Sequence, residues 1–303
     1  MTISFHEGEL GVQERAGVRA MAERVGQGVH GAVSPAARHV LATQRFAVVG
    51  GFDEGGRIWA SPLTGRRGFV SAPGESLVRV EARPSAGDPL HAALRAGAPV
   101  GLIIIDLARR VRMRVNGVVL RETNSLFEVE AREVYMNCPK YIQARAPEAA
   151  GGSAAPEPVA ERSPCLGSEQ REFIERADTF FIATTHPERG ADASHRGGLP
   201  GFVRVEGDRR LVWPDYSGNA MFNTLGNLAV DPKAGLLFID FENGDTLQVS
   251  GRAGIIWDEG RAAEVAGAER VVEFDIEEVV ETRGALPLRW RLEEYSPFNP
   301  ARP

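Results

Sequence analysis

The chain has 303 residues, of which 43% are hydrophobic and 25% are charged, and its formal net charge is −6 at pH 7. This length is enough for two globular domains with a core each. The acidic balance argues against a dedicated nucleic-acid-binding protein, which carries a basic patch or stripe. Because Cys138 and Cys165 are the two cysteines, a disulfide framework is not expected either.

The start of the chain and its hydropathy pattern predict a cytoplasmic protein. Residues 1–10 lack the basic and apolar regions of a signal peptide. No apolar run approaches the roughly 18 residues of a membrane-spanning helix. We therefore expect neither a membrane nor a nucleic acid among the partners.

The first half of the chain predicts short strands with few helices. Residues 1–33 are glycine-rich and are expected to be a partly helical extension. Ser34, an N-cap residue followed by proline, is predicted to begin a helix. The elements expected after it are strands at 46–49, 58–61 and 69–71, a short helix at 89–96, and strands at 101–106, 111–115 and 126–134.

The second half repeats this order. Ser168 is predicted to begin the helix. The elements expected after it are strands at 180–184, 202–205 and 210–213, a short helix at 221–228, and strands at 235–240, 247–250 and 271–280. The segment 144–167 between the halves contains a run of Ala, Gly, Ser and Pro that is typical of a flexible linker.

The two halves form an internal repeat. Val100–Gly117 aligns with Ala234–Gly251 without a gap, and 6 of these 18 positions are identical. A period this long indicates a duplicated domain rather than a solenoid. We predict a mainly β chain with flanking helices (α+β), built from two tandem small β-barrels. The expected parts are an extension at 1–33, a first domain at 34–143, a linker at 144–167 and a second domain at 168–303.

A polar segment at 214–228 has no counterpart in the first half and is the first candidate for function. Asn219, Asn223 and Thr224 gather at the start of a predicted helix. Free backbone N–H groups and the positive end of the helix dipole bind anions such as phosphate there. The alternative is a cluster of cap and turn residues without a ligand.

Two further segments offer candidates. In 193–203, Arg196 can bind a phosphate through its forked guanidinium, and Gly197 lets a flat ligand approach the backbone. The alternative is a glycine-rich turn between strands. In 137–143, Cys138 lies near Lys140, one of two lysines in the chain. The alternative there is simply a helix start.

These segments carry a family resemblance. The motifs are Ser194-His-Arg-Gly-Gly-Leu-Pro-Gly-Phe-Val203, Pro214-Asp-Tyr-Ser-Gly-Asn-Ala-Met-Phe-Asn-Thr-Leu-Gly-Asn227 and Asn137-Cys-Pro-Lys-Tyr-Ile142. Together with 285–290 and 296–299 they resemble the pyridoxamine 5'-phosphate oxidase-like flavoproteins, over about residues 34–300. The resemblance implies FMN-binding split β-barrels with FMN in the groove between two barrels. Here the duplicated chain would supply both barrels as an intrachain pseudo-dimer.

Carried over by position, the resemblance implies a set of FMN contacts. Asn223 and Thr224 lie where the family binds the phosphate, although it often has Ser-Arg-Lys there, so Arg196 is expected to supply part of the charge. Gln248 is expected beside the flavin ring, and Lys140 is expected to reach in from the other barrel. The full expected set is Lys140, Ser194, His195, Arg196, Gly197, Tyr216, Asn219, Asn223, Thr224 and Gln248.

The implied function is an FMN-dependent oxidoreductase acting on an unidentified small molecule. No catalytic residue is identified, and no metal is expected because the spacing of His186, Asp192 and His195 fits no standard site. The substrate-binding arginine–histidine pair of true pyridoxamine phosphate oxidases has no match near 289–291. The alternatives are a flavin carrier without turnover, or a split barrel that uses haem or the deazaflavin F420. Pairing of two chains as a homodimer is also open.

Overall fold

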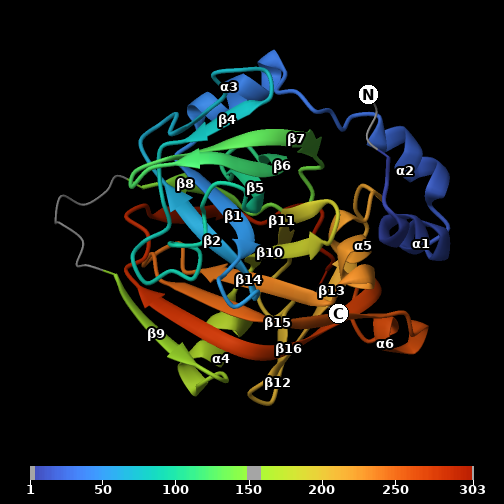
Figure 1. Ribbon diagram of the computed structural model, residues 1–303. Coiled ribbons are helices and arrows are strands. Elements are labelled where there is room, and N and C mark those ends of the chain that lie inside the picture. The colour runs from blue at the N-terminus through green and yellow to red at the C-terminus, as the bar shows by residue number, and fades with distance from the viewer. Residues whose placement is uncertain (1–3, 149–157, 302–303) are drawn as a thin grey trace.

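The computed structural model describes residues 4–148 and 158–301. Its main feature is a pair of antiparallel sheets, one from each half of the chain, which lie against each other (Figure 1). The first sheet occupies the blue-to-green half of the ribbon and the second the yellow-to-red half. None of the helices in the described part of the chain is long and apolar enough to cross a membrane.

The first sheet has seven strands. They are β1 (Phe46–Phe52), β2 (Ile58–Thr64), β3 (Val70–Ser71), β4 (Leu77–Val80), β5 (Pro99–Asp106), β6 (Val111–Glu122) and β7 (Phe127–Asn137). Their order across the sheet is β2-β1-β5-β6-β7-β4-β3.

The second sheet has eight strands. Seven of them are β10 (Thr179–His186), β11 (Gly190–Gly197), β12 (Arg204–Glu206), β13 (Arg210–Tyr216), β14 (Lys233–Ile239), β15 (Thr246–Ile256) and β16 (Ala268–Arg283). Their order, β11-β10-β14-β15-β16-β13-β12, is that of the first sheet with β10–β16 in place of β1–β7. The eighth, β9 (Val159–Ser163), pairs with β16. This shared topology confirms the predicted split-barrel fold and supports a duplication.

Six helices flank the sheets in the described residues. They are α1 (Glu7–Arg15), α2 (Arg19–Gly26), α3 (Pro35–Thr43), α4 (Ser168–Arg176), α5 (Asn223–Val230) and α6 (Glu259–Ala263). The cap of α3 is Ser34, as predicted, and its side chain accepts a hydrogen bond from the Ala37 N–H at 3.2 Å. The cap of α4 is Gly167 rather than Ser168, because Gln170 reaches back to accept from the Gly167 N–H at 2.9 Å.

The structure differs from the prediction in three segments. The helix expected at 89–96 is a series of turns, whose Asp88 carboxylate accepts from the Leu90 N–H at 2.8 Å. The strand β11 was not predicted, since its polar side chains face the other half of the chain. Strands β8 (Ala144–Pro147) and β9 occupy parts of the expected linker. β8 pairs with β17 (Trp290–Glu294), and residues 149–157 lie outside the described part of the chain.

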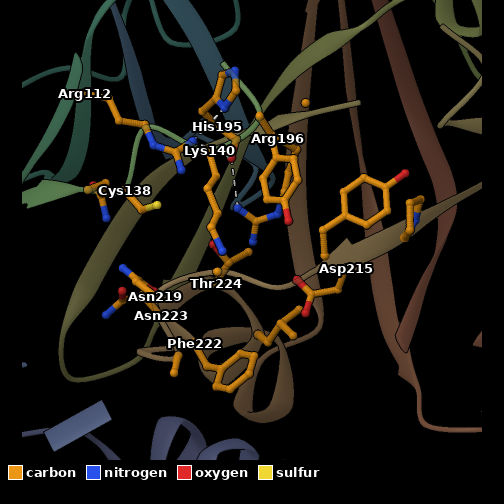
Figure 2. A pocket seen from close by; sticks show the side chains of 18 of the residues that line it. Arg112, Cys138, Lys140, His195, Arg196, Asp215, Asn219, Phe222, Asn223 and Thr224 are labelled. Atoms are coloured by element: carbon orange, nitrogen blue, oxygen red, sulfur yellow. Dashed lines mark hydrogen bonds between the residues drawn. The ribbon is translucent and has the colours of Figure 1, made fainter. Parts of the chain in front are cut away.

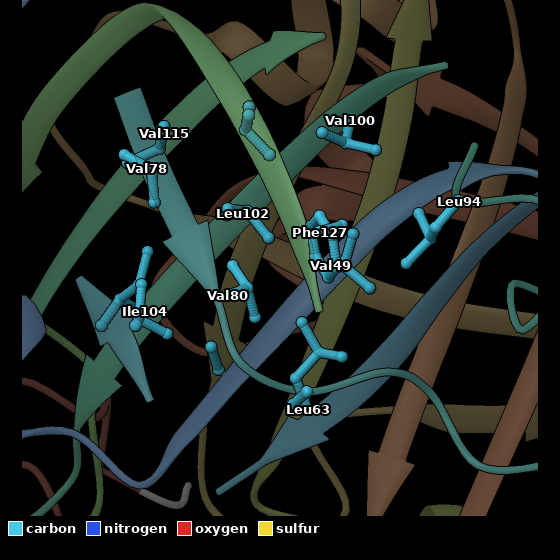
Figure 3. Packing of buried hydrophobic residues seen from close by; sticks show 14 of the residues in the cluster. Val49, Leu63, Val78, Val80, Leu94, Val100, Leu102, Ile104, Val115 and Phe127 are labelled. Carbon is cyan, nitrogen blue, oxygen red and sulfur yellow. The ribbon is translucent and has the colours of Figure 1, made fainter. Parts of the chain in front are cut away.

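Buried apolar residues form a core in each half and a third core between them. Val49, Leu102 and Phe127 belong to the core of the first half (Figure 3). The core of the second half includes Phe180 and Trp213. The third core contains residues from both halves: Phe46, Val48, Ile58, Ala60, Ile103, Ile105, Leu107, Ile142, Phe181, Ala183, Ala193, Leu237, Ile239, Phe241, Leu286, Leu288 and Trp290. The halves therefore share a continuous apolar interface, which burial stabilises.

Two glycines of the repeat allow this close packing. A Cβ on Gly101 would lie 2.5 Å from the Cα of Asp192, and a Cβ on Gly235 would lie 2.5 Å from the Cα of Trp59. Each glycine thus faces backbone of the opposite half, where no side chain fits. This close packing explains why both halves carry glycine at this position.

Candidate functional site

A pocket lies between the two halves, beside the start of α5. The first half contributes residues of β6 and of the segment after β7, and the second half contributes β11, β13 and the turn before α5. The lining residues are Arg112, Arg114, Asn137, Cys138, Lys140, Tyr141, His195, Arg196, Gly197, Phe202, Pro214, Asp215, Tyr216, Gly218, Asn219, Ala220, Phe222, Asn223, Thr224 and Leu225.

Positive charge dominates the lining. Arg112 comes from β6, Arg196 from β11, and Lys140 from the segment after β7 (Figure 2). Arg114, also from β6, lines the pocket as well. Arg114 is neutralised by Asp192, whose carboxylate lies 3.0 Å from its guanidinium. Within residues 4–148 and 158–301, none of the other three forms an ion pair with a carboxylate. The pocket therefore carries an excess of unpaired cations.

Neutral groups hold the two unpaired guanidiniums in place. Arg112 donates to His195 Nδ1 at 2.7 Å, and Arg196 donates to the Ser194 hydroxyl at 2.7 Å. Burial, together with the charges of Arg114 and Arg196, lowers the pKa of Arg112 to about 9. Burial also lowers the pKa of Arg196, against the attraction of Asp215. An anion between these two guanidiniums would offset the free-energy cost of burying each positive charge.

His195 is neutral in this environment. Burial lowers the pKa of its imidazole well below the ordinary value, and Arg112 and the neighbouring arginines act in the same direction. Since Nδ1 accepts from Arg112, the proton of the ring resides on Nε2. This buried N–H has no acceptor among the described residues.

Other buried polar atoms of the lining also lack hydrogen-bond partners. In the described chain they include the Arg112 Nε, the Asn137 Oδ1 and the Thr224 Oγ1. Buried polar groups in folded proteins are nearly always hydrogen-bonded, so water or a polar ligand in the pocket is expected to satisfy these atoms.

The backbone around the pocket is strained. Four residues other than glycine have positive φ among the described ones, and three of them line the pocket: Tyr141 (66°), Ala220 (61°) and Phe222 (60°). A left-handed conformation costs an L-residue about 1–2 kcal/mol. Such conformations gather at functional sites, where surrounding contacts hold them.

Aromatic rings line the side of the pocket towards β13. The rings of Tyr141 and Tyr216 lie with their centroids 5.2 Å apart, and the Tyr141 hydroxyl donates to the Ser217 carbonyl at 2.9 Å. The Phe222 ring lies 4.8 Å from the Arg270 guanidinium, which also pairs with Asp215 at 3.3 Å. The pocket thus combines flat apolar surfaces with cations.

The structure brings most of the residues proposed from sequence together. Eight of them line the pocket: Lys140, His195, Arg196, Gly197, Tyr216, Asn219, Asn223 and Thr224. Ser194 lies behind the lining and accepts from both Arg114 and Arg196. Sequence reasoning did not select Arg112, Arg114, Tyr141, Asp215 or Phe222, although Arg114 is the repeat counterpart of Gln248 and Arg112 lies on the same strand face.

Gln248 does not belong to this pocket, which corrects the expectation for this residue. It is 1% exposed, and its amide donates to the Ala60 carbonyl and the Ser61 hydroxyl, both at 3.0 Å. It also donates to the Asp88 carboxylate at 3.1 Å, and Ser61 donates to the same carboxylate at 2.6 Å. Side chains of the protein therefore fill the groove that corresponds to the pocket by the repeat.

A separate cluster of His6, Glu7 and His186 lies where α1 meets β10, with ligand atoms within 4.8 Å of one another. Each imidazole accepts a backbone N–H on Nδ1, from Gly8 and from Glu188, both at 3.2 Å. Because Nδ1 accepts in both rings, it cannot donate the hydrogen bond that a metal-binding imidazole makes through the nitrogen that does not bind the metal. The cluster fits an anchor for α1 better than a set of metal ligands.

Comparison with known proteins finds a family match in the second half. Residues 166–283, from just before α4 to the end of β16, match the family model described as pyridoxamine 5'-phosphate oxidase. This match confirms, over residues 166–283, the resemblance inferred from the motifs. No curated protein matches the chain.

Solved structures similar to part of this chain include the following three. HupZ of Group A Streptococcus has 14% identity and a TM-score of 0.32, covering 38% of this chain and 91% of its own. An FMN-binding protein of Syntrophomonas wolfei has 12% identity and a TM-score of 0.28, covering 37% and 88%. A protein of Clostridium acetobutylicum related to general stress protein 26, of the pyridoxinephosphate oxidase family, has 12% identity and a TM-score of 0.29, covering 41% and 92%.

Proposed function

We propose that the pocket between the two halves binds FMN and that the chain is a flavin-dependent oxidoreductase acting on a small molecule. The observation that carries the proposal is the pair of guanidiniums of Arg112 and Arg196, which line the pocket without a carboxylate partner in the described residues. The match of residues 166–283 to the pyridoxamine 5'-phosphate oxidase family model supports the same ligand class.

The lining residues suit the two ends of FMN. A phosphate dianion requires cations and hydrogen-bond donors, and Arg196, the Thr224 hydroxyl and the first turn of α5 supply them. A flat ring system requires aromatic or apolar surfaces, which Tyr141 and Tyr216 supply. Bound flavin would carry the electrons of the reaction, while the protein supplies binding and orientation.

Two neighbouring groups would set the electrostatics around the ring. The Arg112 guanidinium favours negative charge nearby, and the His195 Nε2–H can donate a hydrogen bond to an acceptor. Both groups are fixed by their mutual hydrogen bond at 2.7 Å. We expect them to favour electron-rich forms of a ligand in this pocket.

The first test is the absorption spectrum of the purified protein and of the supernatant released by heat. A flavin spectrum that chromatographs as FMN supports the proposal, and reduction by NADH or NADPH would separate an oxidoreductase from a flavin carrier. A haem or F420 spectrum would show that the protein binds that cofactor in place of FMN. A colourless protein that takes up no added FMN would overturn the proposal.

The second test is the substitution Arg196→Ala, with the exposed Arg66→Ala as control. Loss of a charge-assisted contact to phosphate should weaken FMN binding by at least about tenfold. Arg66→Ala should leave the affinity unchanged. Unchanged affinity in Arg196→Ala would remove this residue from the site.

A further inference from the structure

The N-terminal helix α1 packs directly on α5, the helix that opens with Asn223 and Thr224 at the pocket (Figure 1). The contact depends on two glycines. A Cβ on Gly8 would lie 2.2 Å from the Gly226 carbonyl oxygen, and a Cβ on Gly226 would lie 2.7 Å from the Cα of Glu9. The backbones of the two helices therefore touch, which brings the side chains of α1 within reach of the pocket turn.

Gln13 of α1 contacts that turn. Its side chain is fully buried, and its amide donates to the Met221 carbonyl at 2.9 Å. Its own oxygen accepts from Arg19 at 2.8 Å, which fixes the orientation of the amide. Met221 lies between Ala220 and Phe222, the two left-handed residues of the turn. Gln13 thus binds the carbonyl between two strained positions, where an outside contact is needed to hold the backbone.

Glu9 makes a second contact one turn earlier in α1. One carboxylate oxygen accepts from the Asn223 side-chain amide at 2.6 Å, and the other accepts from the His6 N–H at 2.9 Å in the capping box of α1. Glu9 is 5% exposed, so the bond to Asn223 is shielded from water. The side chain of a pocket residue is therefore oriented by a helix that does not itself line the pocket.

We propose that Gln13 and Glu9 are positioning residues of the cofactor pocket, and that α1 keeps the turn at 220–223 in its binding conformation. The choice of FMN as the ligand rests on the proposed function. The role of α1 in holding the turn does not depend on it. Neither residue lines the pocket. Their effect on binding must pass through Met221 and Asn223.

The test uses the full chain and two matched glycine substitutions in α1. Gly8→Ala places a methyl group against the Gly226 carbonyl and should lift α1 from α5. Gly11→Ala adds the same methyl group to the same helix at an exposed position with no atom within 4 Å. Both raise helix propensity, so a difference between them reports the docking of α1. Gln13→Met removes the hydrogen bond while keeping the side-chain volume.

The first measurement is hydrogen exchange of the backbone amides at 219–224 without added flavin. Gly8→Ala and Gln13→Met should speed this exchange by about tenfold or more, since the turn opens locally. Gly11→Ala should match the unmodified protein. Equal exchange in all variants would overturn the proposal, whatever ligand the pocket takes.

The second measurement is FMN affinity. Gly8→Ala and Gln13→Met should weaken binding by about tenfold, and Gly11→Ala should not. Gln248→Ala is a further control, because it removes an equally buried glutamine that bonds to the Ala60 carbonyl, away from the pocket. Weaker binding in Gln248→Ala to the same extent would indicate a general loss of stability and overturn the specific role of α1. If the unmodified protein binds no FMN, the proposed function fails while the exchange result still decides the role of α1.

Discussion

Arg114 and Gln248 occupy the same position in the two sheets, and each crosses to the other half to bond a serine. Arg114 pairs across its sheet with Ile103, and Gln248 with Leu237. Arg114 donates to Ser194, and Gln248 donates to Ser61 at 3.0 Å. The same strand position thus reaches the opposite half in both sheets, and Arg114 lines the pocket beside α5 whereas Gln248 does not.

Removing one partner of the ion pair between Arg114 and Asp192 should be strongly destabilising. Both side chains are buried, at 8% and 4% exposure. Asp192→Asn leaves the guanidinium buried without its counter-charge, and we expect the free energy of unfolding to fall by about 3–5 kcal/mol. Urea unfolding measures this loss. Glu81→Gln, which breaks an exposed pair with Arg66, should change stability little, and an equal effect of both substitutions would contradict the prediction.

Asp88 should make stability depend on pH. Burial raises the pKa of its carboxyl from 3.8 to about 6. The folded state therefore holds this proton more tightly than the unfolded state, so stability falls as pH rises from the unfolded pKa to the folded one. The loss attributable to Asp88 should reach about 3 kcal/mol above this window.

Asp88→Asn tests this dependence by urea unfolding at a series of pH values. The difference in free energy of unfolding between the unmodified protein and the variant should change between pH 3.8 and about 6 and be constant above this window. A difference that does not vary with pH would show that the carboxyl does not titrate in this way.

The glycines at the interface should not tolerate a side chain. Gly101→Ala and Gly235→Ala each place a Cβ within about 2.5 Å of backbone atoms in the opposite half, so the sheets must separate locally. We expect each to lower the free energy of unfolding by about 1–3 kcal/mol or more. Gly254→Ala, on strand β15 with no atom within 4 Å, should be neutral or slightly stabilising. Thermal unfolding of the three variants decides this, and tolerance at both interface positions would disprove it.

Each chain should hold one flavin rather than two. The groove that corresponds to the pocket is filled by Asp88, Ser61 and Gln248, which bond to one another. Released FMN, measured against protein concentration, should therefore approach a ratio of one. A ratio near two would mean that the filled groove opens to take a second molecule.

Local signals in the sequence predicted much of the fold. Ser34 beside proline indicated α3, and the apolar run at 101–106 indicated the buried strand β5. The strand β11 escaped prediction because Asp192 and Ser194 face the other half, where polar groups bond across the interface. Alternation of polar and apolar residues indicates a strand only when one face is solvated.

The candidate site was harder to predict, because its composition depends on contacts between distant segments. Gln248 matched the expected strand position, but Asp88 fills its groove and the sequence alone does not reveal that side-chain contact. Arg112 lies on the strand face of β6 that corresponds to the face of Gln248 in β15, and it lines the pocket. The contact of Gln13 with Met221 joins residues 208 positions apart, and the sequence contains no pattern that links them.

The covalent connection between the halves has a consequence for how the pocket is assembled. When two identical subunits form a shared groove, dilution separates them and the groove is lost, and any substitution appears on both sides at once. Here Arg112 and Arg196 reach the same pocket from one polypeptide. Formation of the pocket is therefore unimolecular, and ligand affinity should not depend on protein concentration. The two sides can also carry different residues at the same position, as Arg114 and Gln248 do.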